Sequence, residues 1–179
     1  ITSAATPFAI MRSVPAGSTM TLTVERGGTT QDVSFDSVAA SATETGSKLG
    51  VYLSADPVLP VDITVNIDGV GGPSAGMMFS LSIIDRLTPG DMTGGNVIAG
   101  TGTMSYDGQV GAIGGIQQKL WGAHRDGAQW FLAPSNNCDE VVGHVPDGLR
   151  VVSVSTLDEA VSAVRSIADG TGDSLPTCQ

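Results

Sequence analysis

Two runs near the start of the chain alternate between apolar and polar residues. In the run 19–25 methionine, leucine and valine alternate with threonines, and in the run 31–38 valine and phenylalanine alternate with polar residues. Period-two alternation is typical of strands with one buried face, and two glycines between such runs are typical of a hairpin turn. Because Gly27 and Gly28 separate the two runs, we predict a β-hairpin. A short helix over 4–14 is expected before it.

From residue 61 onward the pattern indicates alternating strands and helices. Residues 61–67 alternate valine and isoleucine with polar residues, which predicts a strand, and a glycine-rich turn at 69–72 follows. Residues 73–87 are rich in apolar side chains and predict a buried helix. The other expected elements are a linker at 39–47, two short strands around Asp107-Gly108, strands at 128–133 and 149–154, and helices at 113–125 and 156–168. This alternation predicts an α/β (α+β) fold.

The composition fits one ordinary domain, or one domain with a fragment of another. The chain has 179 residues, of which 41% are hydrophobic and 15% are charged, as in a globular protein. Its formal net charge of −10 argues against a nucleic-acid partner, because phosphates require a basic surface. No apolar run reaches the ~18 residues of a membrane span, and no signal-like segment follows Ile1. We therefore expect a piece of a longer protein, with any membrane anchor outside it.

The two cysteines suggest a compartment. Cys178 lies in a tail, 170–179, that is rich in glycine, serine and proline and has no evident reason to be ordered. A disulfide to Cys138 would hold this tail and stabilise the fold by roughly 3–4 kcal/mol. We predict this bridge, and with it an oxidising, extracytoplasmic location. The alternative is two unrelated thiols.

The segment Gly72-Pro73-Ser74-Ala75-Gly76 carries the strongest chemical signal. It follows the expected strand and begins the expected helix, so the Ser74 hydroxyl is exposed on a tight turn. Backbone N–H groups of the turn and the positive helix end face the same space, where they can stabilise an oxyanion. The alternative is a serine that caps the helix.

A nucleophilic serine needs a base, and the chain offers three candidates. His124 lies near the end of a helix, where a charged imidazole suits the helix dipole, and His144 lies in a polar loop. Lys119 lies on a helix that follows the glycine-rich segment 111–115. A lysine acts as a base only in its neutral form, which apolar surroundings favour. The alternative is an ordinary solvated lysine.

Several ordered motifs resemble the proteolytic domain of Lon-type serine proteases. The segment 72–76 resembles the family's nucleophile motif, and the segments 107–110, 114–120 and 123–125 resemble the block that ends in its catalytic lysine. The resemblance extends over residues 49–165. It implies an α/β peptidase domain that needs no cofactor or metal, acts on protein or peptide substrates, and can form a homo-oligomeric, hexameric ring.

The resemblance also assigns roles at the site. It implies that Ser74 is the nucleophile and Lys119 its base, supported by the turn residues Gly72, Pro73 and Ala75. Thr101, in a Thr-Gly pair that the family has near the dyad, is implied to orient Lys119. At Gly71 the family usually has an acidic residue, and this departure puts the regulation of the site in question rather than the dyad.

The first 38 residues resemble the second half of a PDZ domain. We therefore expect a PDZ fragment at 1–38, a linker at 39–48 and a Lon-like domain at 49–179. This combination resembles membrane-anchored, extracytoplasmic proteases. No Walker-A pattern is present in the chain, and ATP independence is expected if the missing N-terminal part is only an anchor and the rest of the PDZ domain. Two alternatives remain: an esterase that uses His144 and Asp139 with Ser74, and a binding module without catalysis.

Overall fold

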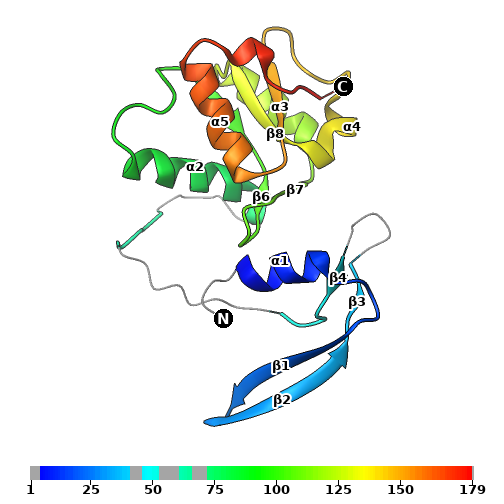
Figure 1. Cartoon of the computed structure of the whole chain (residues 1–179). Coiled ribbons are helices and arrows are strands. Elements are labelled where there is room, and N and C mark those ends of the chain that lie inside the picture. The colour runs from blue at the N-terminus through cyan, green and yellow to red at the C-terminus, as the bar shows by residue number, and fades with distance from the viewer. Residues whose placement is uncertain (1–4, 41–45, 53–60, 66–71, 179) are drawn as a thin grey trace. The chain divides into compact units, whose positions relative to one another are not determined.

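The computed structural model describes residues 5–40, 46–52, 61–65 and 72–178 of the chain (Figure 1). Its contacts divide it into two compact units, Ile1–Val65 and Asn66–Gln179. The division falls later in the chain than the expected linker at 39–48. Each unit is described by itself below.

The first unit contains the predicted hairpin. Strands β1 (Thr19–Arg26) and β2 (Thr29–Asp36) are antiparallel, with Arg26 opposite Thr29. Gly27 and Gly28 both have positive φ, 60° and 77°, as a tight two-residue hairpin turn requires. On one face, hydroxyls of β1 hydrogen-bond to polar side chains of β2 across the ladder. The expected short helix is also present, as α1 (Ala5–Ser13).

The rest of this unit departs from the expected elements in two places. The expected linker 39–47 begins and ends in a second antiparallel pair, β3 (Val38–Ala39) and β4 (Ser47–Lys48), although its centre, 41–45, lies outside the described residues. The described part of the expected strand 61–67, residues 61–65, is not a strand, and 43% of Val61 is exposed. An alternating pattern becomes a strand only beside a partner, and no described strand pairs with this segment. The rest of that strand and the turn 69–71 lie outside the described residues.

The second unit is built on a parallel sheet of three strands. Their order is β5 (Ile98–Gly100), β8 (Trp130–Pro134) and β9 (Arg150–Val154), with β8 in the centre and buried throughout. Alternate side chains of β8 enter two separate cores, Leu132 on one face and Phe131 on the other. This confirms the predicted α/β class and the strands expected near 128–133 and 149–154.

Helices cover both faces of this sheet (Figure 1). The first face carries α2 (Gly76–Leu87) and α5 (Leu157–Ala168), and the second carries α3 (Ile116–Arg125) and the short α4 (Cys138–Val141). The helix expected from residue 73 starts as a single 3-10 turn, η1 (Pro73–Ala75), and of α2 only Met77 and Leu81 are buried. α2 is therefore a half-buried covering helix rather than a core helix.

Shorter elements complete the unit. The predicted hairpin around Asp107-Gly108 is present as β6 (Thr103–Met104) and β7 (Val110–Gly111). The 3-10 turns η2 (Ser135–Asn137) and η3 (Gly172–Ser174) follow β8 and α5. None of the helices in the described part of the chain has the length and the apolar run that crossing a bilayer requires.

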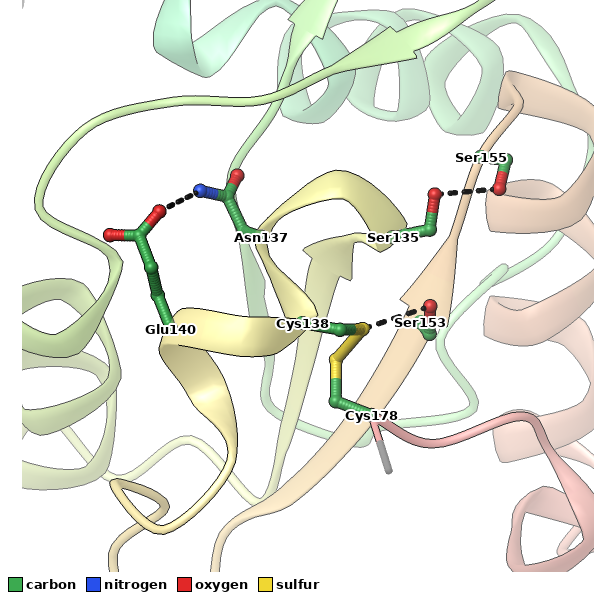
Figure 2. Close-up of a disulfide and its surroundings, with 7 residues drawn as sticks. All are labelled: Ser135, Asn137, Cys138, Glu140, Ser153, Ser155 and Cys178. Carbon is green, nitrogen blue, oxygen red and sulfur yellow. Dashed lines mark hydrogen bonds between the residues drawn. A yellow bond between two sulfur atoms is a disulfide. The ribbon is translucent and has the colours of Figure 1, made fainter. Parts of the chain in front are cut away.

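The C-terminal tail is fixed at two points. Cys138 and Cys178 form the expected disulfide (Figure 2). The Ser153 N–H of β9 also donates to the Pro176 carbonyl at 2.9 Å. The Cys178 side chain also packs against the core beneath α3. The tail is therefore part of the fold.

Candidate active site

Ser74 lies in η1, and its backbone is held against the end of β5. The Ser74 carbonyl oxygen accepts two hydrogen bonds, from Gly102 N–H at 2.8 Å and from the Thr101 hydroxyl at 2.9 Å. In the next turn the donor and acceptor roles are reversed, because Met77 N–H donates to the Gly102 carbonyl at 3.1 Å. The chain around the serine is thereby clamped to the two residues that follow β5.

Two glycines permit this close approach. A Cβ atom on Gly102 would lie 2.7 Å from Val110 Cγ1, and one on Gly76 would lie 3.1 Å from the backbone nitrogen of Met104. Gly72 has a φ of 89°, which side-chain-bearing residues rarely adopt. The glycines of the serine motif therefore serve both the turn and its contact with β6.

Strand direction places Lys119 at the same edge of the sheet as Ser74. Thr101 and Gly102 follow the carboxyl end of β5, and β5 and β8 are parallel. α3 packs on β8 and leads through a short loop to its start, so the first turn of α3 lies toward the carboxyl end of β8. In parallel α/β sheets this edge is the usual place for a functional site.

Lys119 itself is half-buried in the first turn of α3. In the sequence it lies between Ile116 and Leu120, which are fully buried, and its backbone N–H donates to the Gly115 carbonyl at 3.2 Å. Within the described residues, neither the Lys119 amine nor the Ser74 hydroxyl makes a hydrogen bond, so the two are not joined to each other. Catalytic hydrogen bonds often form only when substrate is bound.

Comparison with known proteins identifies the family. Residues 12–166 match the model of the Lon protease (S16) C-terminal proteolytic domain. The chain belongs to this family. It is 32% identical over 148 residues to Lon protease 2 of Herpetosiphon aurantiacus and 31% identical over 160 residues to the Lon protease of Vibrio parahaemolyticus, which covers 80% and 84% of this chain.

These relatives are much longer proteins. The matched part amounts to 18% of the first relative and 19% of the second. The chain is therefore a serine peptidase domain of the Lon type, and it spans about a fifth of the length of the Lon proteases it matches. The match starts at residue 12, within the segment 1–38 that was expected to be a PDZ fragment.

The other candidate residues have partners other than Ser74 among the described contacts of the Lon domain. His144 is exposed, with Nδ1 3.1 Å from the Val142 carbonyl oxygen of its own loop, and no ion pair joins it to Asp139 within the described residues. His124 stacks edge-on with Trp121, at 6.4 Å between ring centroids. Neither histidine is linked to Ser74 by a described hydrogen bond.

Two features of the Lon domain's site go beyond what the sequence predicts. The Thr101 hydroxyl donates its proton to the Ser74 carbonyl rather than toward Lys119. Thr101 Oγ1 can therefore interact with Lys119 only as a hydrogen-bond acceptor, through its lone pairs. Asn137 is not among the predicted site residues, although it is 1% exposed and binds the segment before α3. A polar residue just after an apolar strand is the signal that could have indicated it.

Proposed function

We propose that this domain is an endopeptidase in which Ser74 is the nucleophile and Lys119 the general base. The observation that carries the proposal is the clamp on Ser74 at the end of β5, at the edge toward which the first turn of α3 points. The clamp holds the half-buried Ser74 in its turn, and Lys119 lies in the first turn of α3, the helix that precedes the neighbouring strand β8. A serine, a nearby lysine and backbone donors are together sufficient for acyl transfer.

The reaction proceeds in two halves. Neutral Lys119 Nζ accepts the proton of Ser74 Oγ, and Oγ attacks the carbonyl carbon of the scissile peptide. The tetrahedral intermediate collapses, the C–N bond breaks, and the leaving amine takes the proton from Lys119. Water then attacks the acyl carbon while Lys119 Nζ accepts its proton, the bond from that carbon to Ser74 Oγ breaks, and Oγ takes the proton back from Lys119 as the carboxylic acid product leaves.

The hydrogen bonds of the turn limit which N–H groups stabilise the oxyanion. Gly76 N–H donates to the Pro73 carbonyl, and Met77 N–H donates to the Gly102 carbonyl. Because these two donors are already engaged, any N–H group of this turn that stabilises the substrate oxyanion must lie before Gly76. Those of Ser74 and Ala75 are the nearest, and one such donor contributes about 3 kcal/mol to the transition state.

Substitutions of the dyad test the proposal. Ser74→Ala and Lys119→Ala are each expected to abolish hydrolysis of an unstructured protein substrate, with circular dichroism unchanged. Lys119→Arg is the matched control for charge: it keeps a cation at the site but no group that becomes neutral, so it is expected to be equally inactive. Activity retained in folded Lys119→Ala would refute the dyad.

The competing esterase mechanism makes the opposite prediction at His144. If His144 and Asp139 served Ser74, His144→Ala would abolish turnover and Lys119→Ala would spare it. The exposed position of His144 and its contact within its own loop favour the lysine mechanism. A fluorophosphonate probe that fails to label Ser74 in the folded protein would instead indicate a binding module.

The setting proposed for the protein is extracytoplasmic and independent of ATP. The Cys138–Cys178 disulfide supports an oxidising compartment, because such bridges persist there and are rare in the cytosol. The helix α1 and the hairpin β1–β2 are compatible with a PDZ fragment, which would join the domain to an anchored protein. Protein or peptide substrates and a homo-hexameric ring complete the proposal.

A further inference from the structure

Asn137 is a buried amide that binds both backbone polar groups of one residue in another segment. It ends η2, and its Oδ1 accepts from Ile113 N–H at 2.9 Å while its Nδ2 donates to the Ile113 carbonyl at 2.9 Å. Nδ2 also donates to Glu140 Oε1 at 2.8 Å (Figure 2). With 1% of its surface exposed, this amide is paired by protein groups alone on both of its sides.

The segment that Asn137 holds leads directly into the helix of Lys119. Ile113 lies between β7 and α3 and is followed by Gly114 and Gly115, which add backbone freedom and no side chain. Gly115 caps α3 with a φ of 72° and no side-chain cap. In the described structure, the Asn137 amide provides the hydrogen bonds that tie residues 112–115 to another element.

A second contact secures the first turn of α3 from the same side. Gln117 Nε2 donates to the Glu140 backbone carbonyl at 3.2 Å, and the Glu140 carboxylate receives the Asn137 amide. The segment after β8 thus holds both the loop before α3 and its first turn. Lys119 lies in that turn, two residues after Gln117.

We propose that Asn137 is a positioning residue, which sets the first turn of α3 so that Lys119 Nζ reaches Ser74 Oγ. The inference rests on the proposed dyad. A general base works only within hydrogen-bond reach of its proton, and a displacement of about 1 Å is enough to cost about 100-fold in rate. The loop before α3 is rich in glycine and is free to move by that distance unless another group holds it. The buried Asn137 amide, with its hydrogen bonds to Ile113, restrains it.

Asn137→Ala in the full-length protein is the primary test. It is expected to lower kcat by about 10-fold or more with KM changed by less than about 2-fold, because substrate contacts away from Lys119 are unaffected. The matched control is Asn136→Ala, an exposed neighbour in the same 3-10 turn, which is expected to stay within about 2-fold of the wild type. Fluorophosphonate labelling of Ser74 should slow in parallel with kcat.

A paired substitution separates positioning from general stability. Asn137→Asp keeps the acceptor for Ile113 N–H but faces the Glu140 carboxylate, and it is expected to be as impaired as Asn137→Ala. Adding Glu140→Gln supplies an amide that donates back to the new carboxylate, and it should restore kcat by about 3-fold or more. If Asn137→Ala does not fold, the exposed Glu140→Ala decides, with an expected fall in kcat of about 3-fold.

The outcomes divide cleanly. Wild-type kcat in folded Asn137→Ala, or in Glu140→Ala where that variant decides, overturns the inference while leaving the dyad intact. The inference is also overturned if Asn137→Ala lowers kcat and raises KM by equal factors and Glu140→Gln does not rescue Asn137→Asp, because that pattern indicates a general structural effect. Activity in folded Lys119→Ala would instead refute the dyad itself. That result comes from a separate variant, so it is distinguishable from a failure of the Asn137 inference.

Discussion

The Thr101 hydroxyl offers a test in which packing and hydrogen bonding are separated by two substitutions of one residue. Thr101 is 2% exposed, and its hydroxyl donates to the Ser74 carbonyl at 2.9 Å. Thr101→Val keeps the shape but removes the donor. Thr101→Ser keeps the donor but removes a buried methyl group. The two variants therefore report on different physical terms at the same position.

The expected magnitudes follow from the partners. In Thr101→Val the Ser74 carbonyl keeps its 2.8 Å bond from Gly102 N–H, so no buried acceptor is left unpaired and the free energy of unfolding falls by about 1 kcal/mol. In Thr101→Ser the lost methyl group costs a similar amount, about 1 kcal/mol. Equal stability loss makes the comparison of their activities informative.

Activity should distinguish them. Without the hydroxyl, the backbone of Ser74 is held by one hydrogen bond instead of two, and Thr101 Oγ1 is no longer available to Lys119. We expect kcat/KM to fall by about 10-fold in Thr101→Val, the equivalent of ~1.4 kcal/mol, and by less than about 3-fold in Thr101→Ser. The assay is peptide hydrolysis well below the melting temperature, with unfolding by urea measured alongside. Equal activity of the two variants would refute a role for the hydroxyl at the site.

Three further predictions concern the surrounding fold. Gly76→Ala should leave the melting temperature nearly unchanged, because about 1 kcal/mol of added helix propensity offsets the 3.1 Å approach of the new Cβ to Met104. It should nevertheless reduce activity, because the added methyl group moves the serine turn. Full activity would show that Met104 moves instead of the turn. Thiol titration under denaturing conditions should find no free cysteine, and Cys178→Ser should lower the free energy of unfolding by up to about 4 kcal/mol for a bridge with a sequence separation of 40, measured by urea unfolding; two free thiols per chain would exclude the bridge. Hydrogen bonds from the Thr93 hydroxyl and then the Thr93 N–H hold the pKa of the Asp91 carboxyl below its ordinary value, so its contribution to stability is present above the unfolded-state pKa and is lost as the pH falls through the folded value. Carboxyl NMR titration should show that pKa rising in Thr93→Val, and an unchanged value would contradict this origin.

Local sequence patterns determine much of the fold. The hairpin at 19–36 follows from alternation around Gly27-Gly28, and the buried strand β8 follows from a short apolar run. Thr156 and Glu159 predict the start of α5, and the Thr156 hydroxyl does accept from Glu159 N–H at 3.2 Å. The Glu159 carboxylate, however, accepts from Ser155 N–H rather than from the Thr156 N–H of a capping box. Such signals are readable because they depend on residues within one turn or one hairpin.

Elements that depend on distant partners are not readable in this way. The pair β3–β4 joins residues about ten positions apart through a segment with no strand pattern, and residues 61–65 have a strand pattern but no described partner. Whether a segment forms a strand is decided by its neighbour, and local alternation does not contain that information.

The same division holds at the site. The sequence by itself determined the candidate residues, because Ser74 lies in a distinctive glycine motif and Lys119 in a block that resembles one family. Only the tertiary structure decided that the Thr101 hydroxyl binds the Ser74 carbonyl and that Asn137 holds the loop before α3. These contacts join residues 27 and 24 positions apart. They exist because parallel strands bring their carboxyl ends to one edge of a sheet, which is a property of the assembled fold and not of any local segment.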